Sequence, residues 1–178
     1  MSLLTREKVE QAIGILEEKE IDLWLTFVRE TSAGGDPVLP LIYGDAGLTW
    51  QSALILTRTG ERYAIVGRFE VETARSTGAY ETVIGYDESL RLELLPILER
   101  LDPGCIALNY SADDVLADGL SHGLYTVLMG YLHDTPFADR IVSAEGIIRA
   151  LRGRKTPGEV SRIKAAVETT RVIYERTF

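Results

Sequence analysis

Cysteine and histidine are scarce in this 178-residue chain, which contains one Cys and two His. Cys105 has no partner for an intramolecular disulfide, so the sequence fits a reducing compartment. His122, His133 and Cys105 show no HxxxH, HExxH or CxxC spacing, which excludes the common zinc motifs. We therefore expect no metal site in this chain.

Long apolar runs and a leader sequence are also lacking. No segment approaches the roughly 20 apolar residues that cross a bilayer. Near the start, Leu3-Leu4 is followed at once by Thr5-Arg6-Glu7-Lys8, which does not resemble a signal peptide. The net charge is −8 and the only basic cluster, residues 149–155, is short, which disfavours a nucleic-acid partner. We predict a cytoplasmic protein that binds neither membranes nor nucleic acid.

Short β-rich runs alternate with helical patterns, which predicts an α/β fold with a mixed sheet covered on both faces. Residues 22–28 are apolar on both alternations, as in a strand buried on both sides. Residues 52–57 and 62–66 flank Thr59-Gly60 and are predicted to form a hairpin. Length and composition fit a single domain with one hydrophobic core, and no domain boundary is indicated before Gly153.

The other predicted strands are short and the helices separate them. Pro96 is compatible with its helix only if that helix effectively begins near it. A short helix is expected to begin at a capping box of Ser111 and Asp114 and to end at Asp118-Gly119. We expect the remaining strands at 81–84, 105–109 and 140–142, and the remaining helices at 5–19, 70–76, 89–101, 121–132 and 143–152.

The last helix is the best specified of all. The Thr156 hydroxyl can accept from the Glu159 N–H while the Glu159 carboxylate accepts from the Thr156 N–H, and Pro157 suits the first helical position. A narrow apolar stripe follows, formed by Val160, Ile163, Val167, Thr170 and Tyr174. No Gly, Asn or Pro follows to end the helix before Phe178. We therefore expect it to be the first element of a missing segment.

The segment RxRKTPGEVxRIKAAVE, preceded by SAEGIIRAL, resembles the junction in the creatinase/Xaa-Pro peptidase family, which includes prolidase and aminopeptidase P. There, an N-terminal α/β domain leads into a metal-dependent catalytic domain. The matching positions are Lys155, Pro157, Glu159, Ile163 and Ala166. The resemblance implies that residues 1–152 form the N-terminal domain, with a ribonuclease-H-like three-layer α/β/α fold. Residues 153–178 would be a linker and the first helix of an absent catalytic domain.

The same resemblance implies a function for the parent protein. It would hydrolyse the bond before a proline in a small peptide, using two manganese or cobalt ions held by two Asp, one His and two Glu downstream. We therefore expect no catalytic, cofactor-binding or metal-binding residue in this chain. Its partners would be its own catalytic domain and a second subunit of a homodimer, and it would help wall the substrate cleft. Two alternatives are a creatine-like substrate and a free-standing α/β binding or regulatory module without peptidase activity.

Three residues between the first two predicted strands are candidates for contact with a substrate or an interface. They are Arg29, Glu30 and Trp50. Arg29 and Glu30 directly follow the first buried strand, and functional groups gather at carboxyl ends of strands in open α/β sheets. The loop that follows, residues 34–37, is long enough to reach across an interface. A surface ion pair and a mobile loop explain these residues more simply. Trp50 is a candidate interface anchor.

His122 is the fourth candidate, and it lies in the unusual segment ADGLSHG. Asp118, Ser121 and His122 suggest a catalytic triad, but three members within five residues would need implausible backbone bends. No GxSxG elbow is present either. A helix stop at Gly119 and a cap at Ser121 explain the segment more simply. His122 then stays a candidate for contact with a substrate or a partner domain.

Overall fold

One mixed sheet of six strands forms the centre of the structure, a computed structural model that describes residues 3–177. The strand order is β4-β3-β2-β1-β5-β6, and β2 alone runs antiparallel to its neighbours, whereas the other adjacent pairs are parallel. The strands are β1 (Leu23–Val28), β2 (Ser52–Thr57), β3 (Arg62–Gly67), β4 (Thr82–Tyr86), β5 (Ile106–Leu108) and β6 (Ile141–Ser143).

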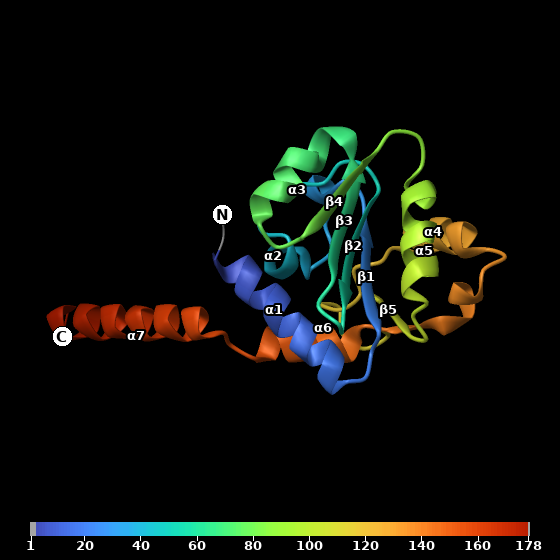
Figure 1. Cartoon of the computed structure of the whole chain (residues 1–178). Coiled ribbons are helices and arrows are strands. Elements are labelled where there is room, and N and C mark those ends of the chain that lie inside the picture. The colour runs from blue at the N-terminus through green and yellow to red at the C-terminus, as the bar shows by residue number, and fades with distance from the viewer. Residues whose placement is uncertain (1–2, 178) are drawn as a thin grey trace.

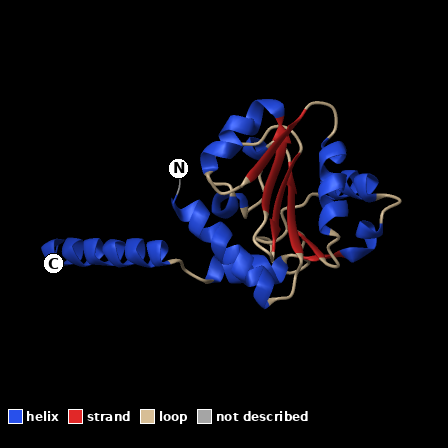
Figure 2. Cartoon of the chain, viewed as in Figure 1, coloured by secondary structure: helices blue, strands red, loops and turns tan. Residues whose placement is uncertain are grey.

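Helices cover both faces of this sheet (Figures 1 and 2). One face packs against α1 (Leu3–Glu18), α2 (Leu39–Ile42), α3 (Val71–Thr77) and α6 (Glu145–Gly153). The other packs against α4 (Leu90–Leu101) and α5 (His122–Leu132). Three 3-10 turns lie at Thr31–Ala33, Arg68–Glu70 and Pro136–Arg140. The predicted three-layer α/β/α fold with a mixed sheet is confirmed.

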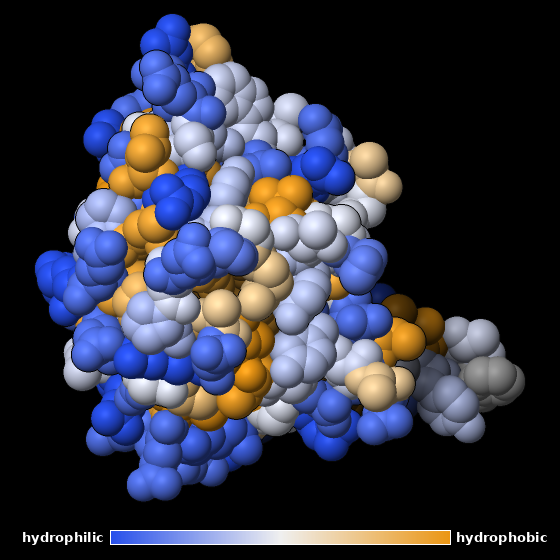
Figure 3. Space-filling model, turned by 90° about the vertical axis from the view of Figure 1, so that its right-hand side faces the viewer, coloured by the Kyte–Doolittle hydropathy of each residue, from blue (hydrophilic) through white to orange (hydrophobic). Residues whose placement is uncertain are grey.

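The strand β1 explains why two cores form. All six of its residues are buried, as the apolar run predicted. Trp24 and Val28 pack into the core beneath α1 and α6, whereas Leu23, Leu25 and Phe27 pack into the core beneath α4 and α5. On the molecular surface at the side of α4 and α5, apolar side chains are interspersed with hydrophilic ones (Figure 3).

The helix expected from Ser111 to Asp118 does not form. The Ser111 hydroxyl does accept hydrogen bonds from the backbone N–H groups of Asp113 (3.1 Å) and Asp114 (2.9 Å). Instead of continuing as a helix, the chain turns back, and the Leu120 N–H donates to the Asn109 carbonyl at 2.8 Å. The cap residues were identified correctly, but their side-chain hydrogen bonds stabilise a turn.

The condition placed on Pro96 is also wrong. The helix α4 begins at Leu90, where Ser89 caps it, and Pro96 lies in its interior. Pro96 removes one backbone hydrogen bond, that to the Leu92 carbonyl. The helix tolerates this loss because Pro96 is on its exposed side, while Leu94 packs fully into the core on the other.

The helix α7 (Pro157–Thr177) extends away from the three layers (Figure 1). Its capping box is confirmed: the Glu159 N–H donates to Thr156 Oγ1 at 3.2 Å, and the Thr156 N–H donates to Glu159 Oε2 at 2.8 Å. None of its described residues is buried, and Val167 of the apolar stripe is 63% exposed. Within residues 3–177 no helix is both long and apolar enough to cross a membrane.

Candidate functional site

The carboxyl ends of β1, β3, β4, β5 and β6 lie at one edge of the sheet, because these five strands run in the same direction. The strand β2 begins at the same edge, where Ser52 pairs with Val28. Arg29, Glu30 and Trp50 therefore lie there, and His122 follows the segment that leaves β5. The structure brings all four predicted contact residues to this carboxyl edge, although they form no single cluster.

The crevice between β1 and β5 is where an open α/β sheet offers a ligand site, since the chain leaves these two strands toward opposite faces. Here the side chain of Asp36 fills it. Asp36 is only 4% exposed and accepts hydrogen bonds from Asn109 Nδ2 (2.7 Å) and the Val38 N–H (3.0 Å). A Cβ at Gly119 would lie 2.1 Å from Asp36 Cγ, so only glycine fits beside this carboxylate.

Asn109 connects this carboxylate to the first strand. Its Nδ2 also donates to Thr26 Oγ1 at 3.2 Å, and its Oδ1 accepts from Trp24 Nε1 at 2.6 Å. Burial raises the pKa of the Asp36 carboxyl; the hydrogen bonds from Val38 and Asn109 oppose this rise, and the charge of Asp118 adds to it. The network satisfies its buried polar atoms internally, so its role is to hold the loop after β1 against β5.

Arg29 and Glu30 are both exposed at the carboxyl edge. Glu30 has a left-handed backbone, with φ of 46°, and its N–H donates to the Thr49 carbonyl at 3.1 Å. This hydrogen bond places Glu30 next to the segment that carries Trp50. Neither charged side chain has an ion-pair partner in the part of the chain that the structure describes.

Trp50 belongs to an aromatic cluster formed by Trp50, Phe69 and Tyr86. The Trp50 ring meets the Phe69 ring edge-on at 6.2 Å and the Tyr86 ring at 5.6 Å. Gly67 makes room for it, since a Cβ there would lie 2.7 Å from Trp50 Cδ2. Phe69 is 78% exposed, with the Arg68 guanidinium 5.0 Å from its ring centre. Exposed aromatic rings and arginine are enriched at protein interfaces.

Phe69 was missed in the sequence because its only signal is its position directly after a β-rich run, two residues beyond Gly67. That position places it at the carboxyl edge once β3 runs parallel to β1. The exposure of Phe69 could not be anticipated, because an isolated aromatic residue in sequence more often joins a core.

His122 opens onto a pocket of about 630 Å³ at the start of α5. Ser121 caps α5 by accepting from the Leu124 N–H at 3.3 Å, and Asp118 accepts from the Ser111 N–H at 3.3 Å. Within the described chain, no hydrogen bond joins the side chains of Asp118, Ser121 and His122 to one another. The pocket is lined by Tyr110, Asp118, Leu120, Ser121, His122, Tyr125, Ala138 and Ile141.

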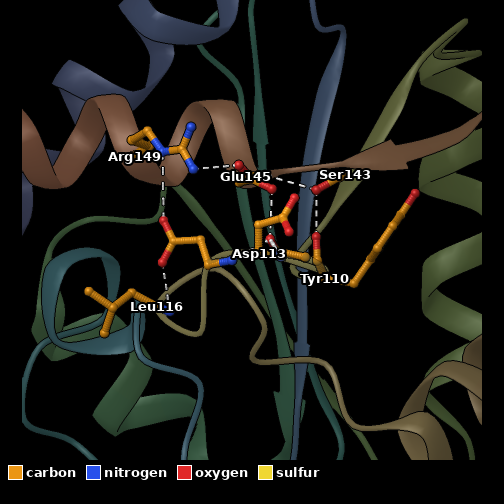
Figure 4. Close-up of polar contacts among 8 residues, drawn as sticks. Tyr110, Asp113, Leu116, Ser143, Glu145 and Arg149 are labelled. Carbon is orange, nitrogen blue, oxygen red and sulfur yellow. Dashed lines mark hydrogen bonds and ion pairs between the residues drawn. The ribbon is translucent and has the colours of Figure 1, made fainter.

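A polar cluster behind this pocket joins the segment after β5 to the start of α6 (Figure 4). The Ser143 hydroxyl donates to the Tyr110 carbonyl, and the Ser111 hydroxyl donates to Glu145 Oε2 at 2.6 Å. Arg149 pairs with Glu145 at 2.6 Å and more loosely with Asp114. The carboxylates of Glu145 and Asp114 are thus engaged with donors. Residues 3–177 contain no group of three or more His, Cys, Asp or Glu that could hold a metal.

No family model and no curated protein matches this sequence. Solved structures do match its fold. An Xaa-Pro dipeptidase from Bacillus anthracis is 16% identical with a TM-score of 0.61, covering 88% of this chain and 38% of that one. An X-Pro aminopeptidase from Thermotoga maritima MSB8 is 21% identical with a TM-score of 0.65, covering 95% and 42%. The chain thus spans about two fifths of these two structures.

A shorter structure is matched over almost its whole length. This is the N-terminal domain of Xaa-Pro dipeptidase from Lactobacillus brevis, which is 16% identical with a TM-score of 0.56. The match covers 80% of this chain and 98% of that one. At such low identity the similarity establishes the fold alone. The chain has the fold of the N-terminal domain of Xaa-Pro peptidases, as the resemblance of its junction segment predicted.

Proposed function

We propose that this chain is the non-catalytic N-terminal domain of an Xaa-Pro peptidase of the prolidase or aminopeptidase P type. The observation that carries the proposal is the coverage: the shared fold accounts for 98% of an isolated N-terminal domain but for 38% of a longer Xaa-Pro dipeptidase structure. The parent would cleave the bond before proline in a small peptide in the cytoplasm. Its two divalent ions, manganese or cobalt, would be bound outside this chain.

In this proposal the chain contributes surfaces to the enzyme. The crevice between β1 and β5 is filled by Asp36, so it offers no space for a substrate. Arg29, Glu30, Trp50 and Phe69, by contrast, expose charge and aromatic area at the carboxyl edge. These four residues would contact a second subunit of a homodimer and wall its substrate cleft.

The pocket at His122, at the start of α5, would provide a second contact surface in the same enzyme. Two half-exposed tyrosines, Tyr110 and Tyr125, line it together with Asp118 and His122. Such a mixture of aromatic and ionisable groups suits contact with a short peptide or with the parent's own catalytic domain. His122 is proposed as a contact residue here and not as a catalytic one.

The reading frame beyond the codon for Phe178 tests the proposal first. A continuation that encodes two Asp, one His and two Glu as metal ligands is the expected result. The extended protein should then hydrolyse Xaa-Pro dipeptides with manganese or cobalt, while residues 1–178 alone should not. An extended protein that is inactive on every Xaa-Pro peptide would refute the peptidase assignment. A stop codon after Phe178 would instead favour the free-standing binding module.

His122→Ala tests whether the pocket only contacts other groups or is itself the catalytic site of a hydrolase. In the extended peptidase the change should raise KM for short peptides and leave kcat nearly unaltered, because His122 only contacts the substrate or the catalytic domain. His133→Ala, the same chemical change at an exposed histidine that does not line the pocket, is the matched control. Loss of kcat by several orders of magnitude in His122→Ala alone would show that His122 takes part in the chemistry.

A further inference from the structure

Lys8 is a fully buried lysine on α1, with 0% of its side chain exposed. Its ammonium Nζ reaches four oxygen atoms. They are Gln11 Oε1 at 3.1 Å, the Leu151 carbonyl at 2.9 Å, the Arg154 carbonyl at 2.7 Å and Glu159 Oε2 at 2.7 Å. A buried charge is costly unless it is paired and hydrogen-bonded, and this ammonium is both.

Three of these oxygen atoms belong to the junction between α6 and α7. The Leu151 carbonyl lies in the last turn of α6, where helical hydrogen bonds run out and a cation is favoured by the helix dipole. The Glu159 carboxylate lies in the first turn of α7 and also accepts from the Thr156 N–H. Burial disfavours the charged form of Glu159, but the hydrogen bonds from Lys8 and Thr156 outweigh it and lower its pKa.

Two further contacts lie at the same junction. The Arg154 guanidinium makes two hydrogen bonds to the Glu18 carboxylate, at 2.5 and 2.8 Å, on an exposed surface. Gly158 lies against α1, since a Cβ there would be 2.8 Å from Glu7 Oε2. Beyond this first turn no described residue of α7 is buried. The direction of α7 is therefore set between residues 154 and 159.

We infer that Lys8 is the positioning residue that fixes the direction of α7 relative to the sheet. Its ammonium group holds the end of one helix and the start of the next at a single point on α1. The effect is large because α7 is a lever: 21 residues span about 31 Å, so a rotation of about 10° at its first turn moves its far end by about 5 Å. The inference concerns this chain alone; that α7 would orient a catalytic domain rests on the proposed function.

Distances between spin labels on the whole 178-residue chain test this inference. In a Cys105→Ala background, nitroxides at positions 99 on α4 and 169 on α7 report the direction of α7, since Glu99 and Thr169 are both exposed. Lys8→Met keeps the length of the side chain and removes its charge. We expect the distance distribution to broaden by about twofold because of the lever, with helix content retained. The matched control is Lys19→Met at the exposed residue that directly follows α1, which should leave the distribution unchanged.

A folded Lys8→Met protein with an unaltered distribution would overturn the inference and leave Lys8 as a stabilising residue only. If Lys8→Met does not fold, a second pair of variants decides. Thr156→Ala and Glu159→Ala both remove half of the capping box, but only Glu159→Ala removes a partner of Lys8. Broader distances in Glu159→Ala than in Thr156→Ala support the inference, and equal distances overturn it. Peptidase activity is not measured, so this inference and the proposed function can fail separately.

Discussion

Asn109 Nδ2 lies 2.7 Å from Asp36 Oδ2, and this buried hydrogen bond joins residues 73 positions apart in the sequence. It ties the loop after β1 to the end of β5 and fills the crevice in which open α/β sheets usually bind ligands. At the carboxyl edge of the sheet, the space between β1 and β5 is thereby occupied by protein side chains and not available to a ligand. What this edge presents outward is the aromatic cluster and the pocket at His122.

Gly119→Ala should destabilise the fold, because its Cβ would overlap the Asp36 carboxylate at 2.1 Å from Cγ. We expect a loss of about 2–3 kcal/mol of unfolding free energy, typical of overpacking at a tight site. Gly130→Ala is the control: it lies in α5 with no atom within 4 Å of the added Cβ, and should gain roughly 0.5–1 kcal/mol. Urea denaturation measures the unfolding free energy of both variants. Similar changes in the two would contradict the conclusion that the Asp36 side chain fills the crevice between β1 and β5.

Asp36 should make stability depend on pH in the opposite sense to an ordinary paired carboxylate. Burial raises its pKa above 3.8 in the folded protein, so the protonated form is favoured by folding. Its contribution is complete below the unfolded pKa of about 3.8 and is lost as pH rises through the higher folded pKa. Relative to Asp36→Asn, which does not titrate, wild type should therefore lose stability as pH rises across this interval.

Urea denaturation from acidic to neutral pH checks this difference. Asp45→Asn, which changes an exposed carboxyl of the same loop region, serves as the control for removing a carboxyl there. If wild type instead gained stability relative to Asp36→Asn as pH rises, the sign would be reversed and the assigned effect of burial would be contradicted.

The sequence predicted best those features that depend on neighbours in the chain. The capping box joins Thr156 and Glu159, three positions apart, and the hairpin of β2 and β3 closes over a short turn, so both could be located correctly. The buried roles of Lys8 and Asp36 depend on residues 143 and 73 positions away, respectively. Lys8 offered one signal: it shares the buried face of α1 with Val9 and Ala12, where a lysine is out of place.

In the candidate site, too, features that depend on neighbouring residues were predicted, whereas features that depend on distant contacts were not. Arg29 and Glu30 were placed at the carboxyl edge because they follow a strongly apolar strand, and that argument needs no tertiary contact. Asn109 also follows a strand, but its role appears only when Asp36 folds onto it from another loop. The aromatic cluster likewise requires β3 and β4 to be parallel neighbours, a pairing that hydrophobic periodicity does not specify.

Val167 in the apolar stripe of α7 should contribute little to the stability of this chain by itself. Val167→Ala, at a residue 63% exposed, should change the unfolding free energy by less than about 0.5 kcal/mol. Val9→Ala makes the same chemical change at a residue with 0% exposure on α1 and should cost about 2 kcal/mol from lost burial and the cavity left behind. A cost for Val167→Ala equal to that of Val9→Ala would mean that α7 packs against something in the isolated chain.

The aromatic cluster leads to a prediction about subunit contact, which rests on the proposed function. Phe69 is 78% exposed and Leu92 on α4 is 57% exposed, so neither Phe69→Ala nor Leu92→Ala should change stability by more than about 0.5 kcal/mol. In the extended protein Phe69→Ala should weaken dimerisation by about tenfold or more, as expected for an aromatic anchor at an interface centre. Leu92→Ala should leave it unchanged. Sedimentation measures both, and equal dissociation constants would place the subunit contact away from the carboxyl edge.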